Sequence, residues 1–228
     1  MPRVLCNRCL RPQSACFCEW ITPVLPVFIE VLILQHPLEA LQAKGSARLL
    51  HLSLANSRMV VGEVFDESVL TADAAISGWP GPTLNFLLYP ALPSDIASQS
   101  LCKAEIDAVL SHHGARKPEV RLVVIDGTWR KSRKMLYLNA WLQRLPRLAL
   151  QDMPASSYRI RKAHKPGQLS TLEATCVALA QLSGDVDKYV PLLRAFDGFV
   201  DQQMARRSEV GPAAQAFSRF NRFNRPSQ

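Results

Sequence analysis

Four of the six cysteines of this 228-residue chain lie close together near its start, where they could bind a metal ion. Two residues separate Cys6 from Cys9, and one residue separates Cys16 from Cys18. Two such pairs of thiolates supply the tetrahedral sulfur ligands of structural Zn²⁺ and leave no open position for a substrate. We therefore predict a structural zinc site within residues 1–22, separate from any catalytic centre.

The start of the chain and its apolar segments indicate where the protein works. Residues 1–6 contain no apolar run and no small-residue cleavage site of the kind that marks a secretory signal peptide. The longest apolar stretch, 27–34, is far shorter than the roughly 18 to 20 residues that a membrane-spanning helix needs. We expect a cytoplasmic protein with reduced cysteines and no membrane partner.

A second candidate site follows the apolar run 120–125, which leads into Asp126. Gly127 permits a tight turn at this point, and Thr128 is placed to cap a helix that begins next. This arrangement puts a carboxylate beside a helix N-terminus, a position where ligands are often bound. The alternative interpretation is that Asp126 or Thr128 only caps the helix.

The positive charge of the chain is concentrated in its second half. The formal net charge is +8, and residues 126–228 contain 17 of the 27 Lys and Arg but only 8 of the 19 Asp and Glu. Four of these cations, Arg130, Lys131, Arg133 and Lys134, begin the helix expected next, where they oppose the helix dipole. An anionic partner such as nucleic acid explains them better than a solvated helix face, which normally alternates Glu with Lys.

Segments typical of strands and of helices alternate along the chain. Short apolar runs rich in β-branched residues predict strands at 27–34, 58–64, 84–89, 120–125 and 148–150. Helical periodicity predicts helices at 38–54, 129–142, 171–181 and 186–207, the third of them with a capping box that begins at Ser170. This order indicates an α/β fold with a mainly parallel sheet, whose ligand sites lie at the carboxyl ends of the strands.

With these segments placed, the chain resembles the DTW-domain family of tRNA-uridine aminocarboxypropyltransferases over residues 1–210. The motifs that carry the resemblance are the four N-terminal cysteines, His36–Glu39, Leu88–Pro90, Asp126–Trp129, Ser157–Lys162 and Ser170–Ala174. The resemblance implies a catalytic domain over 23–210 after the zinc segment 1–22, with a fold related to the knotted SPOUT methyltransferases. The tail 211–228 lies outside the match, and its alternating Phe and Arg suit either RNA stacking or a disordered, solubilising tail.

The resemblance also implies a reaction. The family transfers the 3-amino-3-carboxypropyl group of S-adenosylmethionine to N3 of a tRNA uridine, giving acp3U and methylthioadenosine, and members of this appearance modify the variable loop at position 47 of tRNA. Two alternatives stay open: an RNA methyltransferase of the same fold with the same donor, and a zinc-bearing RNA-binding protein without catalysis. The expected partner is tRNA, which the zinc segment could also contact, and no obligate protein partner is indicated.

Together, the motifs and the resemblance suggest roles for individual residues. Asp126 is the candidate base for the N3 proton of uridine, or alternatively it holds the ammonium or sulfonium of the donor. Trp129 either stacks on adenine or uracil or packs as a core residue at the base of its helix. The donor-binding residues that we expect are Leu88, Tyr89, Pro90, Thr128, Trp129, Thr171 and Glu173. The residues that we expect to contact RNA phosphates are Arg130, Arg133, Lys134, Arg159, Arg161 and Lys162.

Overall fold

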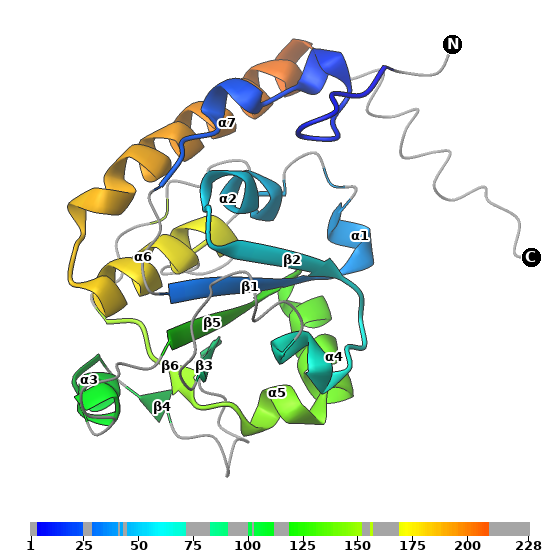
Figure 1. Ribbon diagram of the computed structural model, residues 1–228. Helices are drawn as coiled ribbons and strands as arrows, with labels where there is room; N and C mark the ends of the chain where they lie inside the picture. The colour runs from blue at the N-terminus through cyan, green and yellow to red at the C-terminus, as the bar shows by residue number, and fades with distance from the viewer. Residues whose placement is uncertain are drawn as a thin grey trace, which may run out of the picture.

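The computed structural model describes residues 4–24, 29–40, 42, 45–71, 83–90, 100–101, 103–111, 119–151, 156 and 169–209. Within this part of the chain a six-stranded sheet forms the centre of the fold (Figure 1). Its strands are β1 (Ile29–Gln35), β2 (Ser57–Val61), β3 (Thr83–Leu88), β4 (Ser100–Leu101), β5 (Glu119–Asp126) and β6 (Arg147–Leu148). They are arranged in the order β2-β1-β5-β3-β6-β4, and every pairing is parallel. The α/β fold with a parallel sheet is confirmed.

The two central strands explain why the sheet is buried on both faces. All residues of β5, and all of β1 except Glu30, are buried. Successive side chains of a strand point to opposite faces, and those of β1 and β5 accordingly alternate between two hydrophobic clusters. Val31, Ile33, Leu122 and Val124 belong to the first cluster, and Leu32, Leu34, Val123 and Ile125 belong to the second.

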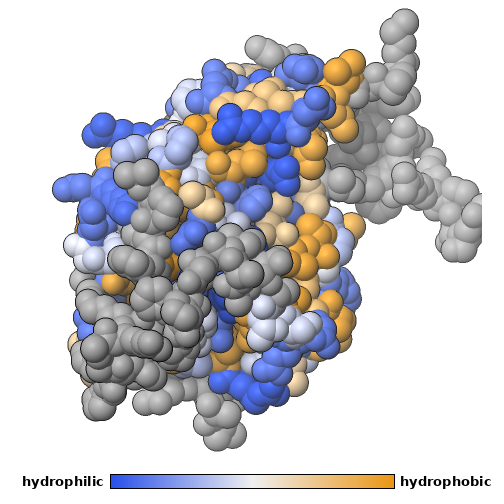
Figure 2. Space-filling model, viewed as in Figure 1, coloured by the Kyte–Doolittle hydropathy of each residue, from blue (hydrophilic) through white to orange (hydrophobic). Residues whose placement is uncertain are grey.

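Helices cover both faces of the sheet (Figure 1), and the described surface seen from the same side mixes hydrophilic and hydrophobic residues (Figure 2). The first cluster is completed by α2 (Ala47–Ser53), α6 (Thr171–Ser183) and the long α7 (Val190–Glu209). The second is completed by α4 (Trp129–Leu138) and α5 (Ala140–Arg144). The remaining helices in the described ranges are α1 (Pro37–Ala40), α3 (Lys103–Ser111) and four short 3₁₀ turns at Gln13–Ala15, Cys18–Trp20, Glu67–Leu70 and Asp187–Tyr189. Among the described residues no helix is long and apolar enough to span a bilayer.

Several predicted elements differ in extent from those observed. The single helix predicted at 38–54 is wrong: α1 and α2 are separate helices, with Gly45 and the N-cap residue Ser46 between them. The helix predicted at 129–142 is interrupted at Asn139, where α4 ends and α5 begins. The last predicted helix begins as a 3₁₀ turn, and α7 follows it. The second residue of α7 is Pro191, a position that proline can occupy because it is tolerated in the first turn of a helix. Strand β4 and helix α3 were not predicted.

The cysteine-bearing segment at the N-terminus packs against α7, far away in the sequence. Phe17 is completely buried, and its ring meets that of Phe199 edge-on with centroids 5.4 Å apart. The side-chain amide of Gln202 donates to the carbonyl oxygen of Cys16, at 3.2 Å. In Figure 1 this dark blue segment lies along α7, on the far side of α2 from the sheet. The segment therefore shares the main hydrophobic core instead of forming an isolated appendage.

Candidate functional site

Asp126 lies at the carboxyl end of β5 and joins three elements. Its register partner on β1 is Gln35, whose side-chain amide donates to Oδ2 of Asp126 at 2.9 Å. The hydroxyl of Thr171, the first residue of α6, donates to Oδ1 at 2.7 Å. Asp126 is only 7% exposed. The predicted strand-end carboxylate is thus present, and neutral donors from β1 and α6 hold both of its oxygens.

The predicted capping box at the start of α6 is confirmed. The hydroxyl of Ser170 accepts from the backbone N–H of Glu173 at 3.2 Å, and the Glu173 carboxylate accepts from the backbone N–H of Ser170 at 2.7 Å. The hydroxyl of Ser156 also donates to both oxygens of Glu173, at 3.0 and 2.9 Å. The hydrogen bonds of Glu173 therefore fix the start of α6, and this start places the Thr171 hydroxyl beside Asp126.

An aromatic stack follows the end of β3. Tyr89 and Trp129 lie nearly parallel, with ring centroids 5.4 Å apart and an angle of 9° between the rings. The guanidinium of the buried Arg147 lies over the Tyr89 ring, 5.5 Å from the ring centroid. Arg147 also donates to the carbonyl oxygen of Pro90 at 2.9 Å. Trp129 itself is 50% exposed. The structure therefore excludes the alternative that Trp129 is a core residue.

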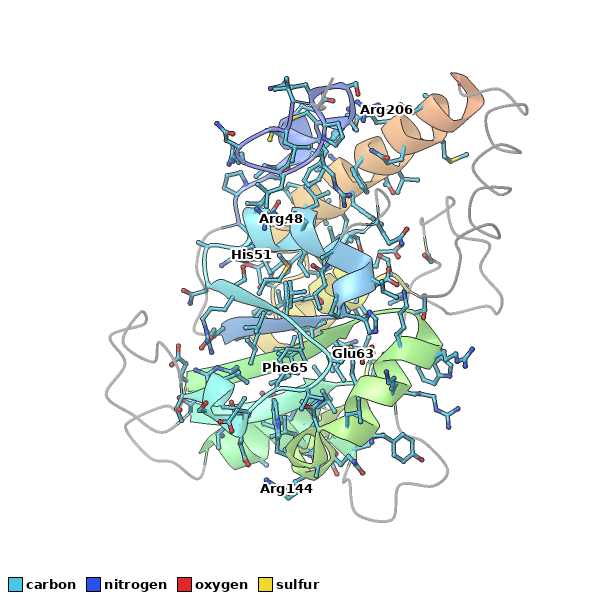
Figure 3. All side chains as sticks on the ribbon, turned by 90° about the vertical axis from the view of Figure 1, so that its right-hand side faces the viewer. Arg48, His51, Glu63, Phe65, Arg144 and Arg206 are labelled. Carbon is cyan, nitrogen blue, oxygen red and sulfur yellow. The ribbon has the colours of Figure 1, made fainter. Side chains whose placement is uncertain are left out.

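A buried histidine and a glutamate link the end of β1 to the loop after β2. His36 accepts from the backbone N–H of Leu38 at Nδ1, at 3.1 Å, so its Nε2 carries the proton and donates to Glu63, at 2.5 Å. Lys134 donates to the other oxygen of Glu63 at 2.7 Å. These hydrogen bonds, that of Lys134 first, hold the pKa of Glu63 below its usual range. Figure 3 shows Glu63 and Phe65 on this loop, close to α4.

Asn139 explains both the shape of this loop and the break between α4 and α5. Its side-chain amide donates to the carbonyl oxygens of Met135 and Glu63, and its Oδ1 accepts from the backbone N–H of Phe65, at 2.7 Å. The indole N–H of Trp141 donates to the carbonyl oxygen of Phe65, at 3.0 Å. Sequence analysis placed His36 in a family motif but did not identify Gln35, Glu63 or Asn139 as site residues. The available signal was that Gln35 and His36 directly follow the apolar core of a strand.

The cations at the start of α4 divide into two groups. Lys131 pairs with Glu39 at 2.7 Å, and Lys134 pairs with Glu63, so two of them have a carboxylate within the chain. Arg130 and Arg133 are exposed and form no ion pair with any residue in the described ranges. Arg130 and Arg133 are therefore the cations at the start of α4 that have no carboxylate partner in the described part of the chain. Arg159, Arg161 and Lys162 lie outside the described residues, as does the tail 211–228.

The four N-terminal cysteines converge in the geometry of a metal site. Their Sγ atoms all lie within 4.8 Å of one another, with 3.6 Å between Cys6 and Cys18 and 3.7 Å between Cys9 and Cys16. Tetrahedral Zn²⁺ with Zn–S bonds of about 2.3 Å requires sulfur atoms about 3.8 Å apart, so the donor set fits this ion. Backbone N–H groups, that of Cys9 first and then that of Arg8, lower the pKa of Cys6 to about 6, whereas burial and the neighbouring thiols raise the pKa of Cys18, so the thiolate is favoured at Cys6 but not at Cys18.

Taken together, these features define an α/β protein with a parallel sheet, polar side chains at the carboxyl ends of its central strands, and four cysteines in the geometry of a metal site. The model of the DTW domain family matches residues 3–204, so the chain belongs to this family. A mouse protein named tRNA-uridine aminocarboxypropyltransferase 2 is 29% identical over 210 residues, and a Drosophila melanogaster protein of the same name is 29% identical over 228 residues. The Arabidopsis thaliana tRNA-uridine aminocarboxypropyltransferase A is 29% identical over 137 residues.

These relatives differ in how much of their own length is matched. The alignment covers 90% of this chain but 65% of the mouse protein, 97% of this chain and 83% of the Drosophila protein, and 59% of this chain and 50% of the Arabidopsis protein. The chain thus spans just under two thirds of the mouse relative. No solved structure was found to match the chain.

Proposed function

We propose that this protein transfers the 3-amino-3-carboxypropyl group of S-adenosylmethionine to N3 of a tRNA uridine, giving acp3U and methylthioadenosine. The observation that carries the proposal is the match of nearly the whole chain to relatives whose names state tRNA-uridine aminocarboxypropyl transfer. We propose the variable-loop uridine at position 47 as the target and the cytoplasm as the place of action.

The reaction requires two contributions from the protein. Uridine N3 carries a proton and becomes nucleophilic as it loses that proton, so a carboxylate in reach assists the attack. When bound, the donor supplies a γ-carbon already activated by the sulfonium: the N3–C bond forms as the C–S bond breaks, and the sulfur keeps the electron pair. The protein must also present the γ-carbon, rather than the methyl group, in line with N3.

We assign the first task to Asp126. Hydrogen bonds from Gln35 and Thr171 stabilise its ionised form and fix its orientation at the strand end. In this state the carboxylate can accept the N3 proton of uridine. The same carboxylate could instead hold the ammonium or sulfonium of the donor, and the kinetic test in the Discussion separates the two roles.

We propose that the donor lies at the adjacent ends of β3 and β5. Leu88 on β3 is the register partner of Val124 on β5, so Tyr89 and Pro90 emerge beside the turn that contains Thr128. A carboxylate is a side chain of the type that the cation of this donor requires, and the exposed ring of Trp129 can stack on a uracil of the RNA. Thr171 and Glu173 stay assigned to this site, Thr171 through its contact with Asp126 and Glu173 through the cap that positions Thr171.

The remaining assignments concern RNA, metal and topology. We propose that Arg130, Arg133 and Lys134, with Arg159, Arg161 and Lys162, contact tRNA phosphates, and that the four cysteines hold a structural Zn²⁺. We also propose the knotted SPOUT-like threading. Its support is the family resemblance together with the position of β5, which is inserted between β1 and β3. A crystal structure of the protein would test the threading.

The labelling of the donor tests the proposed reaction. The protein is incubated with tRNA and with S-adenosylmethionine labelled either in the carboxyl carbon or in the methyl group. We expect carboxyl label, and no methyl label, to enter tRNA, with methylthioadenosine as the other product. Methyl label in the tRNA would instead establish a methyltransferase. Binding of tRNA without transfer of either label would establish an RNA-binding protein.

A further inference from the structure

The outer face of α4 carries aromatic and cationic side chains in a regular row. Trp129, Arg133 and Tyr137 are spaced by four residues, so they lie along one side of the helix. Each of the three is exposed, Trp129 by 50% and Tyr137 by 64%. We call these three residues the α4 stripe. Two large aromatic rings on a solvent-facing helix with an Arg between them are unusual for a surface that contacts only water.

Trp129, at the N-terminal end of the α4 stripe, is held in place by neighbouring side chains. One face of its ring is covered by Tyr89, which is itself backed by the buried Arg147. The hydroxyl of Ser132 donates to the carbonyl oxygen of Trp129 at 3.0 Å and lies 3.4 Å from the hydroxyl oxygen of Tyr89. The indole ring is therefore fixed before any ligand arrives, which reduces the entropy lost when another ring stacks on it.

The charge beside the α4 stripe favours an anion. Arg130 and Arg133 are exposed and have no ion pair within the described ranges, whereas Lys131 and Lys134, on the same helix, are paired with Glu39 and Glu63. Glu39 of α1 and Glu63 of the loop after β2 thus neutralise the two lysines and leave the two arginines. Arginine also stacks on bases, which lysine does not.

We propose that the α4 stripe binds a single-stranded segment of the substrate RNA, with bases stacked on Trp129 and Tyr137 and a phosphate on Arg133. The proposal rests on the proposed function for the identity of the substrate, and it adds which surface receives the RNA and that the RNA is unpaired there. The two aromatic positions lie about 12 Å apart along the helix. This length corresponds to a few nucleotides of a strand with stacked bases, which rises about 3.4 Å per nucleotide along its axis.

The aromatic side chains of the α4 stripe favour an unpaired strand over a duplex. Aromatic side chains bind nucleic acid by stacking on exposed base faces, and a duplex offers such faces only at its ends. A second copy of this chain is a poorer occupant, because the exposed Arg130 and Arg133 would face the same charges on the partner, in a chain of net charge +8.

Three variants of exposed residues test the proposal: Tyr137→Ala, Arg133→Ala and, as the matched control, Tyr137→Phe. The affinity of the full chain is measured for tRNA, for a short single-stranded oligouridine and for a short RNA duplex. We expect Tyr137→Ala to weaken the binding of tRNA and of oligouridine by at least about fivefold, and Tyr137→Phe to bind like wild type because it keeps the ring. Arg133→Ala should lower the slope of log affinity against log salt by about 0.7 for the single strand.

The duplex should bind equally well to wild type and to Tyr137→Ala. The proposal is overturned if Tyr137→Ala binds the single strand like wild type, or if it loses duplex affinity to the same extent. It also falls if this variant alters the oligomeric state and leaves RNA affinity unchanged, because a second copy of the chain would then cover the face.

Transfer of carboxyl label by the wild-type protein is measured in parallel, so that failure of the proposed function can be recognised. Weakened oligouridine binding without any label transfer would leave the α4 stripe as an RNA site and remove the proposed reaction. Normal label transfer with unchanged oligouridine binding would remove the α4 stripe alone.

Discussion

The hydroxyl of Thr171, at the first position of α6, donates to Oδ1 of Asp126, 2.7 Å away at the end of β5. This hydrogen bond spans 45 residues of sequence and fixes the start of one helix on the tip of a central strand. It makes the position of the candidate carboxylate depend on the capping box of α6.

Replacing Thr171 by Val keeps the side-chain volume and removes this hydrogen bond. We expect kcat/KM for tRNA modification to fall by about 10- to 100-fold, because rates fall by factors of this size when a reacting group is displaced from its productive position. The free energy of unfolding should fall by only about 1 kcal/mol. Thr171→Ser keeps the hydroxyl and should retain most of the activity. Unchanged kcat/KM in Thr171→Val would show that this hydrogen bond does not position Asp126.

The substitutions Asp126→Ala and Asp126→Asn should abolish modification while tRNA affinity stays close to that of wild type. The kinetic constants of any residual activity distinguish the two proposed roles. A base acts on the chemical step, so its loss lowers kcat, whereas an anchor for the donor cation also raises KM for S-adenosylmethionine. Turnover at the wild-type rate in Asp126→Asn would remove the carboxylate from both roles.

Removal of the metal ligands should affect stability before chemistry. We expect Cys6→Ser with Cys9→Ser to lose zinc and to lower the free energy of unfolding by more than about 2 kcal/mol, because Phe17 of the same segment packs on Phe199. Elemental analysis and calorimetry measure the two effects, and Cys176→Ser, a buried cysteine outside the cluster, is the control for zinc content. A metal-free wild-type preparation that is stable and active would contradict the zinc assignment.

The lowered pKa of Glu63 predicts a pH dependence of stability. The ionised carboxylate is stabilised by Lys134 and His36, so its contribution is complete above the usual pKa of 4.5 and is lost as the pH falls through the lower value of the folded state. In Glu63→Gln this contribution is missing at every pH. We therefore expect the difference in melting temperature between wild type and Glu63→Gln to be constant near neutral pH and to shrink below pH 4.5. A difference that stays constant down to about pH 3 would exclude this linkage.

Gly198 of α7 tests the docking of the N-terminal segment. A Cβ at this position would come within 2.2 Å of the Trp20 ring, so Gly198→Ala should destabilise the protein by about 1 to 3 kcal/mol. Without this contact the same substitution in a helix would stabilise by up to about 1 kcal/mol. Denaturation of Gly198→Ala, Trp20→Leu and the double variant measures the coupling. If Gly198→Ala is stabilising in the wild-type background, the segment does not pack on α7 as described.

The parts of the fold that could be predicted from the sequence are those governed by local patterns. The β-branched apolar runs around Val31 and Val123 predict central strands because such side chains suit a sheet buried on both faces. Ser170 and Glu173 reveal the capping box because their spacing is fixed by the first turn of a helix. The cysteine spacing predicts the metal site for the same reason, since all four ligands lie within one short segment.

The parts that could not be predicted depend on contacts between distant residues. The start of α4 was interpreted as needing an external anion, but Glu63 lies 71 residues before Lys134, and no local pattern links the two. The break at Asn139 was missed because the residue bonds to a loop more than 70 positions away. Strand β4, which has two residues, gives no periodicity to detect.

The docking of the cysteine segment on α7 has a consequence for biosynthesis. Phe17 leaves the ribosome long before Phe199 is made, and at about 5 to 20 residues per second the delay is on the order of 10 to 40 s. Cys6 to Cys18, in contrast, lie within one short segment, so the ligand set is complete long before Phe199 is translated. Binding of the metal would therefore give the nascent segment its shape early, so that it is already formed when the last helix emerges to receive it.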